Sequence, residues 1–163
     1  MIFVTVGAQL PFNRLVRVVD EWARLSGRSD VFAQIGKTNW KPSYIQSTAF
    51  LKPDKFRSMI ESADIVIAHA GMGSIISALE YSKPILVMPR KASLGEQRND
   101  HQIATARRFL EMKYVSVAFD EKELQEKLNY IKDVDIKNFS KIGCTASIKL
   151  IKTIHDFIEN PYP

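Results

Sequence analysis

The chain has 163 residues, of which 45% are hydrophobic and 25% are charged, so one globular domain can bury its core without disulfides or a structural metal. The single cysteine excludes an internal disulfide and fits a reducing compartment. A net charge of +5 favours anionic partners such as nucleotides and lipid headgroups, whereas no nucleic-acid-binding signature is present. The first residues lack the features of a signal peptide, and no apolar run approaches the ~20 residues that cross a bilayer.

Apolar segments alternate with amphipathic segments, the pattern of a parallel α/β sheet. Strands are predicted at residues 2–6, 31–35, 44–51, 64–68, 85–88 and 115–118. Helices are predicted at residues 11–26, from 53 onward, and at 74–82, 98–112, 121–132 and about 138–159. The pattern predicts a single domain with a doubly wound, Rossmann-like sheet. Ligands of such sheets bind beyond the carboxyl ends of the strands, which here are followed by the loops at 7–11, 36–42, 69–74 and 89–102.

The strongest local signal runs from Ala63 to Ser74, where a hydrophobic strand ends at His69 and is followed by Gly71 and Gly73. Two glycines allow a tight turn and a close approach of the backbone to a ligand. The N-terminus of the following helix would present unpaired N–H groups to a phosphate, to which His69 could donate a hydrogen bond. An ordinary tight turn with Ser74 as the helix N-cap explains the same residues equally well.

Two further loops carry candidate ligand contacts. Gly7 ends the first strand and could meet the same phosphates from the other side, although an ordinary strand-to-helix turn is the simpler interpretation. The segment 89–102 follows a buried strand and ends in Asn99, Asp100, His101 and Gln102. Such donors and acceptors suit the hydroxyl groups of a hexose. The alternative is a solvated helix N-terminus with Asp100 near the helix dipole.

Several rival motifs fail on inspection. A dinucleotide fingerprint would need a third glycine where Ile76 stands, and no phosphate-binding P-loop pattern is present. The D-x-D pattern at 133–135 lies in a polar stretch between predicted helices, so we interpret it as surface. Cys144 lies among apolar residues and is interpreted as a packed helix thiol. The three histidines do not share a metal-ligand spacing, so no metal site is predicted.

Six segments occur in a characteristic order: IFVTVG at 2–7, PFNRLV at 11–16, ADIVIAHAGMGS at 63–74, KPILVMPR at 83–90, GE at 95–96 and NDHQ at 99–102. As a set they resemble the C-terminal nucleotide-binding domain of glycosyltransferase family 28. The resemblance is strongest to single-domain subunits of bacterial exopolysaccharide synthesis. It extends to the catalytic subunit of the eukaryotic UDP-N-acetylglucosamine transferase that acts on dolichol-linked sugars.

The resemblance implies one GT-B half, with a Rossmann-like fold, that binds a UDP-sugar without an essential metal or other cofactor. The backbone near Leu51 would then pair with uracil. The diphosphate would be held by Gly7, Gly71, Gly73 and Ser74, with His69 nearby. The donor sugar would meet Asp100, His101 and Gln102, with Glu96 of the GE pair in the same substrate-binding set.

Two positions depart from the family pattern. Many members carry a ribose-binding glutamate seven residues before the proline of the KP pair, and counting back from Pro84 gives Ser77. Glu80 lies three residues later on roughly the same helix face and is the candidate replacement. The glycine expected before the KP pair is Ser82, and because glycine there usually closes a helix in the left-handed conformation, we expect a local cost.

A GT-B enzyme places its active site between two Rossmann-like domains, and this chain has room for one. The resemblance therefore implies a membrane-anchored partner that supplies the catalytic base and binds a lipid-linked saccharide, to which a hexose is transferred with inversion. The chain would be cytoplasmic and recruited to the inner face of the membrane, with the helix at 138–159 as a possible docking element. Without its partner, the chain could form a homo-oligomer. The alternatives are a non-catalytic accessory subunit and an unrelated nucleotide-binding Rossmann domain.

Overall fold

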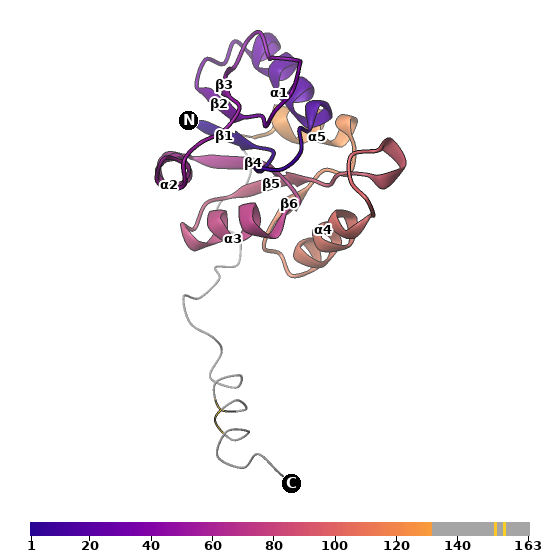
Figure 1. Cartoon of the computed structure of the whole chain (residues 1–163). Helices are drawn as coiled ribbons and strands as arrows, with labels where there is room; N and C mark the ends of the chain where they lie inside the picture. The colour runs from indigo at the N-terminus through magenta and orange to yellow at the C-terminus, as the bar shows by residue number, and fades with distance from the viewer. Residues whose placement is uncertain (132–151, 153–154, 156–163) are drawn as a thin grey trace.

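The computed structural model describes residues 1–131, 152 and 155, and these contain one six-stranded parallel sheet (Figure 1). The strands are β1 (Ile2–Thr5), β2 (Val31–Gln34), β3 (Gln46–Thr48), β4 (Ile65–His69), β5 (Ile85–Met88) and β6 (Ser116–Val117). The helices are α1 (Asn13–Ser26), α2 (Pro53–Ser62), α3 (Met72–Glu80), α4 (His101–Glu111) and α5 (Glu121–Asn129), with a short 3-10 helix, η1 (Ala92–Leu94). The strand order β3-β2-β1-β4-β5-β6 confirms the predicted doubly wound, Rossmann-like sheet.

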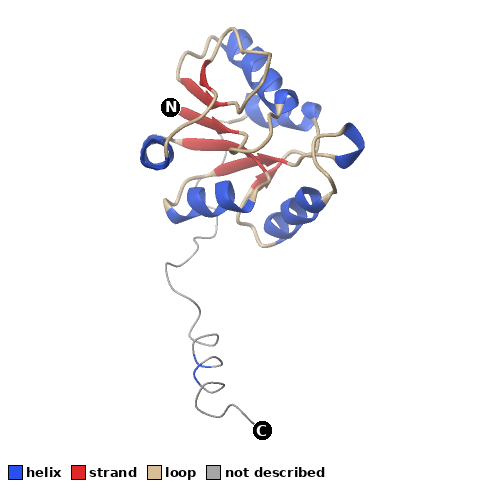
Figure 2. Cartoon of the chain, viewed as in Figure 1, coloured by secondary structure: helices blue, strands red, loops and turns tan. Residues whose placement is uncertain are grey.

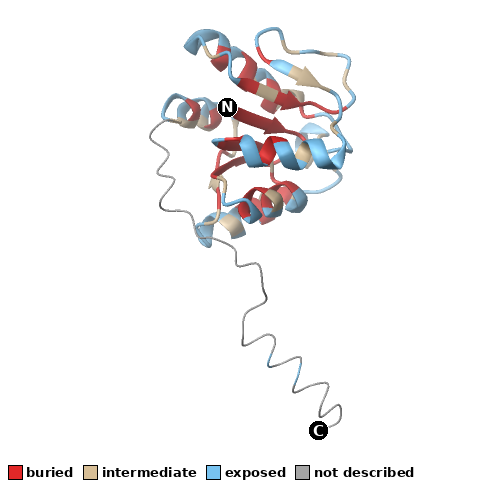
Figure 3. Cartoon of the chain, turned by 90° about the vertical axis from the view of Figure 1, so that its left-hand side faces the viewer, coloured by how far each residue is buried: buried red, intermediate tan, exposed pale blue. Residues whose placement is uncertain are grey.

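Helices cover both faces of the sheet, which explains why its central strands are mostly apolar (Figure 2). Ile2 and Val4 of β1 pack in a core cluster with residues of α1 and α5. Phe3, between them, packs in a second cluster with residues of α2, α3 and α4. Figure 3 shows the buried strands between these two helical layers. The polar loops after β1, β4 and β5 therefore follow strands that are almost entirely buried.

The structure corrects several predicted boundaries. The third strand is β3, which is shorter than the predicted segment 44–51, and α4 begins later than residue 98. Helix α3 begins at Met72 with Gly71 in the N-cap position, so the interpretation of Ser74 as the N-cap is wrong. Ser74 is instead buried in the first turn of the helix. The predicted surface motif at 133–135, Cys144 and almost all of the final helix at 138–159 lie outside the described residues.

The end of α3 shows why a glycine is expected before the KP pair. Ser82 has φ 53, a left-handed conformation that glycine adopts without a steric penalty. Its N–H donates to the carbonyl oxygen of Leu79 at 3.0 Å, and the next N–H, of Lys83, donates to that of Ala78 at 2.8 Å. The turn that leads into β5 therefore keeps its hydrogen bonds, and the cost of serine is confined to its own backbone.

Candidate functional site

Three loops at the carboxyl ends of β1, β4 and β5 enclose a hollow of about 220 Å³. The first contributes Gly7, the second contributes His69 and Gly71, and the third leads into His101 and Gln102 at the start of α4. Five of the twelve predicted substrate-binding residues therefore meet in one place. They come from positions far apart in the chain, and the parallel order of β1, β4 and β5 brings them together.

The imidazole of His69 lies between the two glycine turns. A Cβ atom on Gly71 would be 2.1 Å from Nε2 of His69, and one on Gly7 would be 2.8 Å from Cε1. Gly7 also has φ +78, which is strained for any other residue. The structure thus explains why glycine stands at both positions: any larger residue would collide with the ring of His69. The sequence alone did not show this steric requirement. Gly73 differs, since a Cβ there would meet nothing within 4 Å.

His69 is a neutral polar group in this setting. Burial, with a smaller contribution from the charge of Arg90, lowers its pKa from 6.5 to about 4. Its Nδ1 atom is buried and has no hydrogen-bond partner among the described residues. At neutral pH the ring can therefore donate or accept a hydrogen bond, but it does not carry a positive charge to a ligand.

Arg90 is a further residue of the hollow, and the sequence prediction did not select it as a site residue. It follows β5 and is only 3% exposed. Its Nη2 atom donates to the carbonyl oxygens of Val6 at 2.9 Å and Leu10 at 2.6 Å, and its guanidinium carbon lies 5.1 Å from the ring centre of Phe12. Arg90 comes directly after an apolar strand and a proline, and this position could have marked it as a site residue. It was not selected because the sequence predicts a solvated loop there.

Gln102 and His101 meet the hollow in different ways. Gln102 is buried, and its Oε1 atom accepts a hydrogen bond from the backbone N–H of Arg90 at 3.1 Å. This contact fixes the amide orientation and joins α4 to the end of β5. His101 is exposed, so its side chain is available to a ligand.

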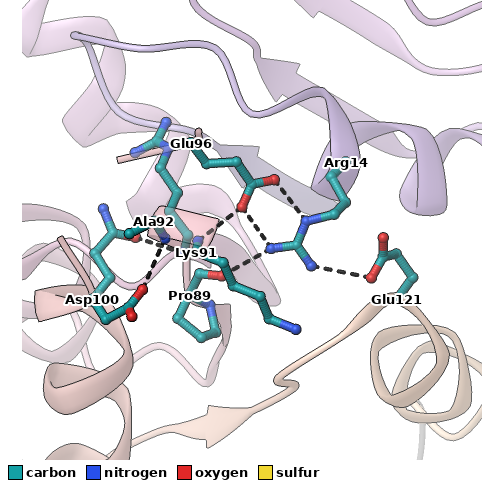
Figure 4. A network of polar contacts seen from close by, with 9 residues as sticks. Arg14, Pro89, Lys91, Ala92, Glu96, Asp100 and Glu121 are labelled. Atoms are coloured by element: carbon teal, nitrogen blue, oxygen red, sulfur yellow. Dashed lines mark hydrogen bonds and ion pairs between the residues drawn. The ribbon is translucent and has the colours of Figure 1, made fainter. Parts of the chain in front are cut away.

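The carboxylates of the β5–α4 loop hold the protein's own groups (Figure 4). Glu96 forms a bidentate ion pair with Arg14, with N–O distances of 2.7 and 2.8 Å, and also accepts from the N–H of Lys91 at 2.9 Å. Asp100 accepts from the N–H of Ala92 at 2.8 Å. Neither carboxylate lies among the residues that line the hollow. Both therefore shape the loop in this structure, and the sugar contacts expected of them stay a prediction.

Leu51 is placed by a buried amide. Its N–H donates to Oε1 of Gln34 at 3.0 Å, and Nε2 of Gln34 donates to the carbonyl oxygen of Gly7 at 3.1 Å. The N–H of Leu51, in the segment whose backbone is expected to pair with uracil, is thus bonded to Gln34 in this structure. Gln34 links the segment after β3 to the turn after β1, and it is a second residue that the sequence prediction did not select.

The remaining predicted residues lie on α3, outside the lining of the hollow. Gly73 and Ser74 are in its first turn, where backbone N–H groups lack partners within the helix. Ser77 is half-buried and Glu80, one turn farther on, is exposed. Glu80, the predicted replacement for the family's ribose-binding glutamate, is therefore a solvent-exposed side chain.

A second, larger hollow of about 1010 Å³ lies beside the loop that follows β2. It is lined by Lys37, Trp40 and Lys41, among others, and by none of the twelve predicted residues. We base the functional argument on the smaller hollow, because the glycine turns, His69 and a buried cation meet there.

The model of the glycosyltransferase family 28 C-terminal domain matches residues 1–156. The chain belongs to this family. The resemblance drawn from the six sequence segments is thus confirmed at the level of the family, and family membership makes the chain part of a group of transferases.

Relatives within the family come from both eukaryotes and bacteria. The chain is 32% identical over 90 residues to "UDP-N-acetylglucosamine transferase subunit ALG13" of Candida albicans, covering 55% of this chain and 29% of that protein. It is 29% identical over 133 residues to the ALG13 subunit of Yarrowia lipolytica, covering 74% and 65%. A pyrophosphoryl-undecaprenol N-acetylglucosamine transferase of Geobacillus kaustophilus is 28% identical over 138 residues, covering 77% and 37%. The chain therefore spans only part of each of these relatives.

Solved structures agree with the fold. A solution structure of ALG13 matches with a TM-score of 0.60 at 19% identity, covering 98% of this chain and 96% of that one. Acinetobacter baumannii MurG matches with a TM-score of 0.59 at 14% identity, covering 82% and 42%. At this identity the likeness establishes a GT-B C-terminal, Rossmann-like fold, and the chemistry must be argued from the site.

Residues 1–131, with 152 and 155, include no helix long and apolar enough to cross a membrane. The same residues include no group of three or more histidine, cysteine, aspartate or glutamate side chains arranged to hold a metal ion.

Proposed function

We propose that this chain binds the UDP-sugar donor of a two-chain GT-B glycosyltransferase. The observation that carries the proposal is the hollow beyond β1, β4 and β5, where two glycine turns, neutral His69 and buried Arg90 meet. The first turn of α3 lies beside it and presents backbone N–H groups suited to a diphosphate. No metal is part of the proposal, because N–H groups and a cation can meet the charge of the departing UDP.

The size of the hollow favours a second chain. Its volume of about 220 Å³ is below the ~300–1,000 Å³ typical of pockets that enclose a small ligand. This chain would therefore enclose one portion of the donor, and a second surface would cover the rest. In the proposed reaction a base on the partner takes the proton of an acceptor hydroxyl. The acceptor oxygen then bonds to the anomeric carbon as the bond to UDP breaks, with inversion.

The names of the relatives guide the choice of donor and acceptor. Both groups of relatives are named for N-acetylglucosamine transfer, so UDP-N-acetylglucosamine is the first donor to test within the UDP-hexose class. The proposed acceptor is a lipid-linked saccharide of polysaccharide synthesis, held by a membrane-anchored partner at the cytoplasmic face. The segment at 138–159 is the proposed docking element.

Calorimetric titration of the full-length chain with UDP and, separately, with NAD tests donor binding. We expect saturable binding of UDP and none of NAD. A chain that binds neither would be an accessory subunit, and a chain that prefers NAD would be an unrelated Rossmann domain. His101→Ala should weaken UDP-sugar binding, whereas the matched control Arg108→Ala, an exposed change on the same helix, should not.

Co-expression with a candidate membrane partner tests the two-chain reaction. A panel of UDP-sugars with a lipid-linked acceptor should yield product only when both chains are present. Equal transfer by the partner alone would contradict the proposal and favour the accessory function.

A further inference from the structure

Arg90 is a buried cation without a dedicated counter-ion. Both of its side-chain hydrogen bonds within the described residues go to the neutral carbonyl oxygens of Val6 and Leu10, and its Nε atom has no partner among those residues. Burial lowers its pKa to about 10, and Glu96 provides the opposing electrostatic contribution. The carboxylate of Glu96 is already bonded to Arg14 at 2.7 and 2.8 Å. Burying a charge in this way is costly unless another group compensates it.

The electrostatics of the hollow follow from this arrangement. Among the described residues that line it, Arg90 is the one lysine or arginine, and the other side chains are apolar, amide, hydroxyl or imidazole groups. His69 stays neutral beside it. The lining includes no carboxylate. An anion in this hollow would meet one full positive charge, and because Arg90 is itself buried, its Coulomb interaction is stronger than that of a fully solvated cation.

The contacts of Arg90 also give it a positioning role. Its guanidinium holds two carbonyl groups of the β1–α1 loop, and its backbone N–H is held by Gln102 of α4. It therefore connects the loop that carries Gly7 to the start of α4, which carries His101. A change at Arg90 would act on both sides of the hollow at once.

We propose that Arg90 determines specificity for the diphosphate portion of the donor, by supplying the charge that an anion in the hollow neutralises and by holding the β1–α1 loop against it. This inference rests on the proposed function. It adds to UDP-sugar binding the residue that recognises the diphosphate. It concerns the preference for UDP over uridine, because these ligands share the base and ribose and differ in the diphosphate.

Calorimetry of the full-length wild type and of Arg90→Met with UDP and with uridine tests the proposal. Loss of a buried charge contact should weaken UDP binding by about 10- to 100-fold, while uridine binding changes by less than about 3-fold. Arg90→Lys keeps the charge and loses the paired carbonyl contacts, so most of the preference for UDP should return. Equal weakening of both ligands in Arg90→Met, or an unchanged ratio, would overturn the proposal.

Arg14→Met is the matched control, because Arg14 holds the β5–α4 loop through Glu96 without lining the hollow. It should lower the Tm and keep the ratio of UDP to uridine affinity. Should Arg90→Met fail to fold, a thermal-shift titration of the wild type and of Arg90→Lys with inorganic pyrophosphate keeps the proposal testable. We expect pyrophosphate to raise the Tm of both proteins, and the absence of any shift would overturn the proposal. A wild type that responds to pyrophosphate but not to UDP would leave the role of Arg90 intact and reject the proposed function.

Discussion

The β4–α3 turn and the β5–α4 loop face the same hollow, yet the first is shaped by close packing and the second by ion pairs. In the turn, a neutral histidine ring fills the space that Gly7 and Gly71 leave open. In the loop, Glu96 and Asp100 accept hydrogen bonds from Arg14 and from backbone N–H groups. Steric contacts tolerate almost no change of shape, whereas partly exposed charges lose strength in salt and solvent. Substitutions in the turn should therefore lower the stability of the protein more than substitutions in the loop.

The largest effect is expected for Gly71→Ala. The backbone of Gly71, with φ −93 and ψ 134, suits alanine, so the whole cost comes from the new Cβ at 2.1 Å from His69. We expect the free energy of unfolding to fall by about 3 kcal/mol, measured by urea denaturation. The double change Gly71→Ala with His69→Ala should recover part of this loss. No recovery would show that the glycine is needed for another reason.

Acid titration tests the neutral state of His69. The pKa of its ring is about 4 in the folded chain and 6.5 as the reference value for the unfolded chain. As the pH falls from 6.5 towards 4, the unfolded chain takes up a proton that the folded chain does not, so stability declines over this window. Allowing for partial exposure of the ring, we expect a loss of about 2 kcal/mol. His69→Asn should remove this component of the pH dependence, and an identical slope in both proteins would contradict the assignment.

The ion pair of the loop should contribute less. Arg14 and Glu96 have side chains only 11% and 14% exposed, so their interaction is partly shielded from water. Arg14→Met should lower the free energy of unfolding by about 1–2 kcal/mol, and a double-mutant cycle with Glu96→Gln should give a coupling of about 1 kcal/mol. Additive effects of the two changes would show that the bidentate contact contributes little in solution.

The smallest effect is expected at Ser82, outside both regions. Ser82→Gly removes the left-handed strain at φ 53 but adds freedom to the unfolded chain. We expect a net gain of up to about 1 kcal/mol in the free energy of unfolding. Ser77→Gly, inside α3, is the contrasting control and should destabilise, because there glycine relieves no backbone strain.

The fold could be predicted from the sequence because apolar strands, glycine turns and amphipathic helices are local patterns. The meeting of Gly7, His69 and Gly71 in the candidate site could be predicted from the same patterns, since parallel strands bring these residues to one edge. The roles of the polar residues could not be predicted in this way. Glu96 bonds to Arg14, 82 positions away, and Arg90 bonds to Val6, 84 positions away, so only the folded chain shows which polar groups are already engaged.

Gln34 imposes a limit on which amino acids its position accepts. Its side chain gives one hydrogen bond to Gly7 and receives one from Leu51 while it is only 3% exposed. Asparagine and glutamine are the side chains that present a carbonyl and an N–H₂ group together, and asparagine is one methylene shorter. Glutamate would set a carboxylate against the Gly7 carbonyl, and leucine would leave two partly buried backbone groups unpaired. In the sequence, position 34 looks like an ordinary core position of a strand, where several residues could substitute for one another. The two hydrogen bonds of its side chain instead restrict it to glutamine.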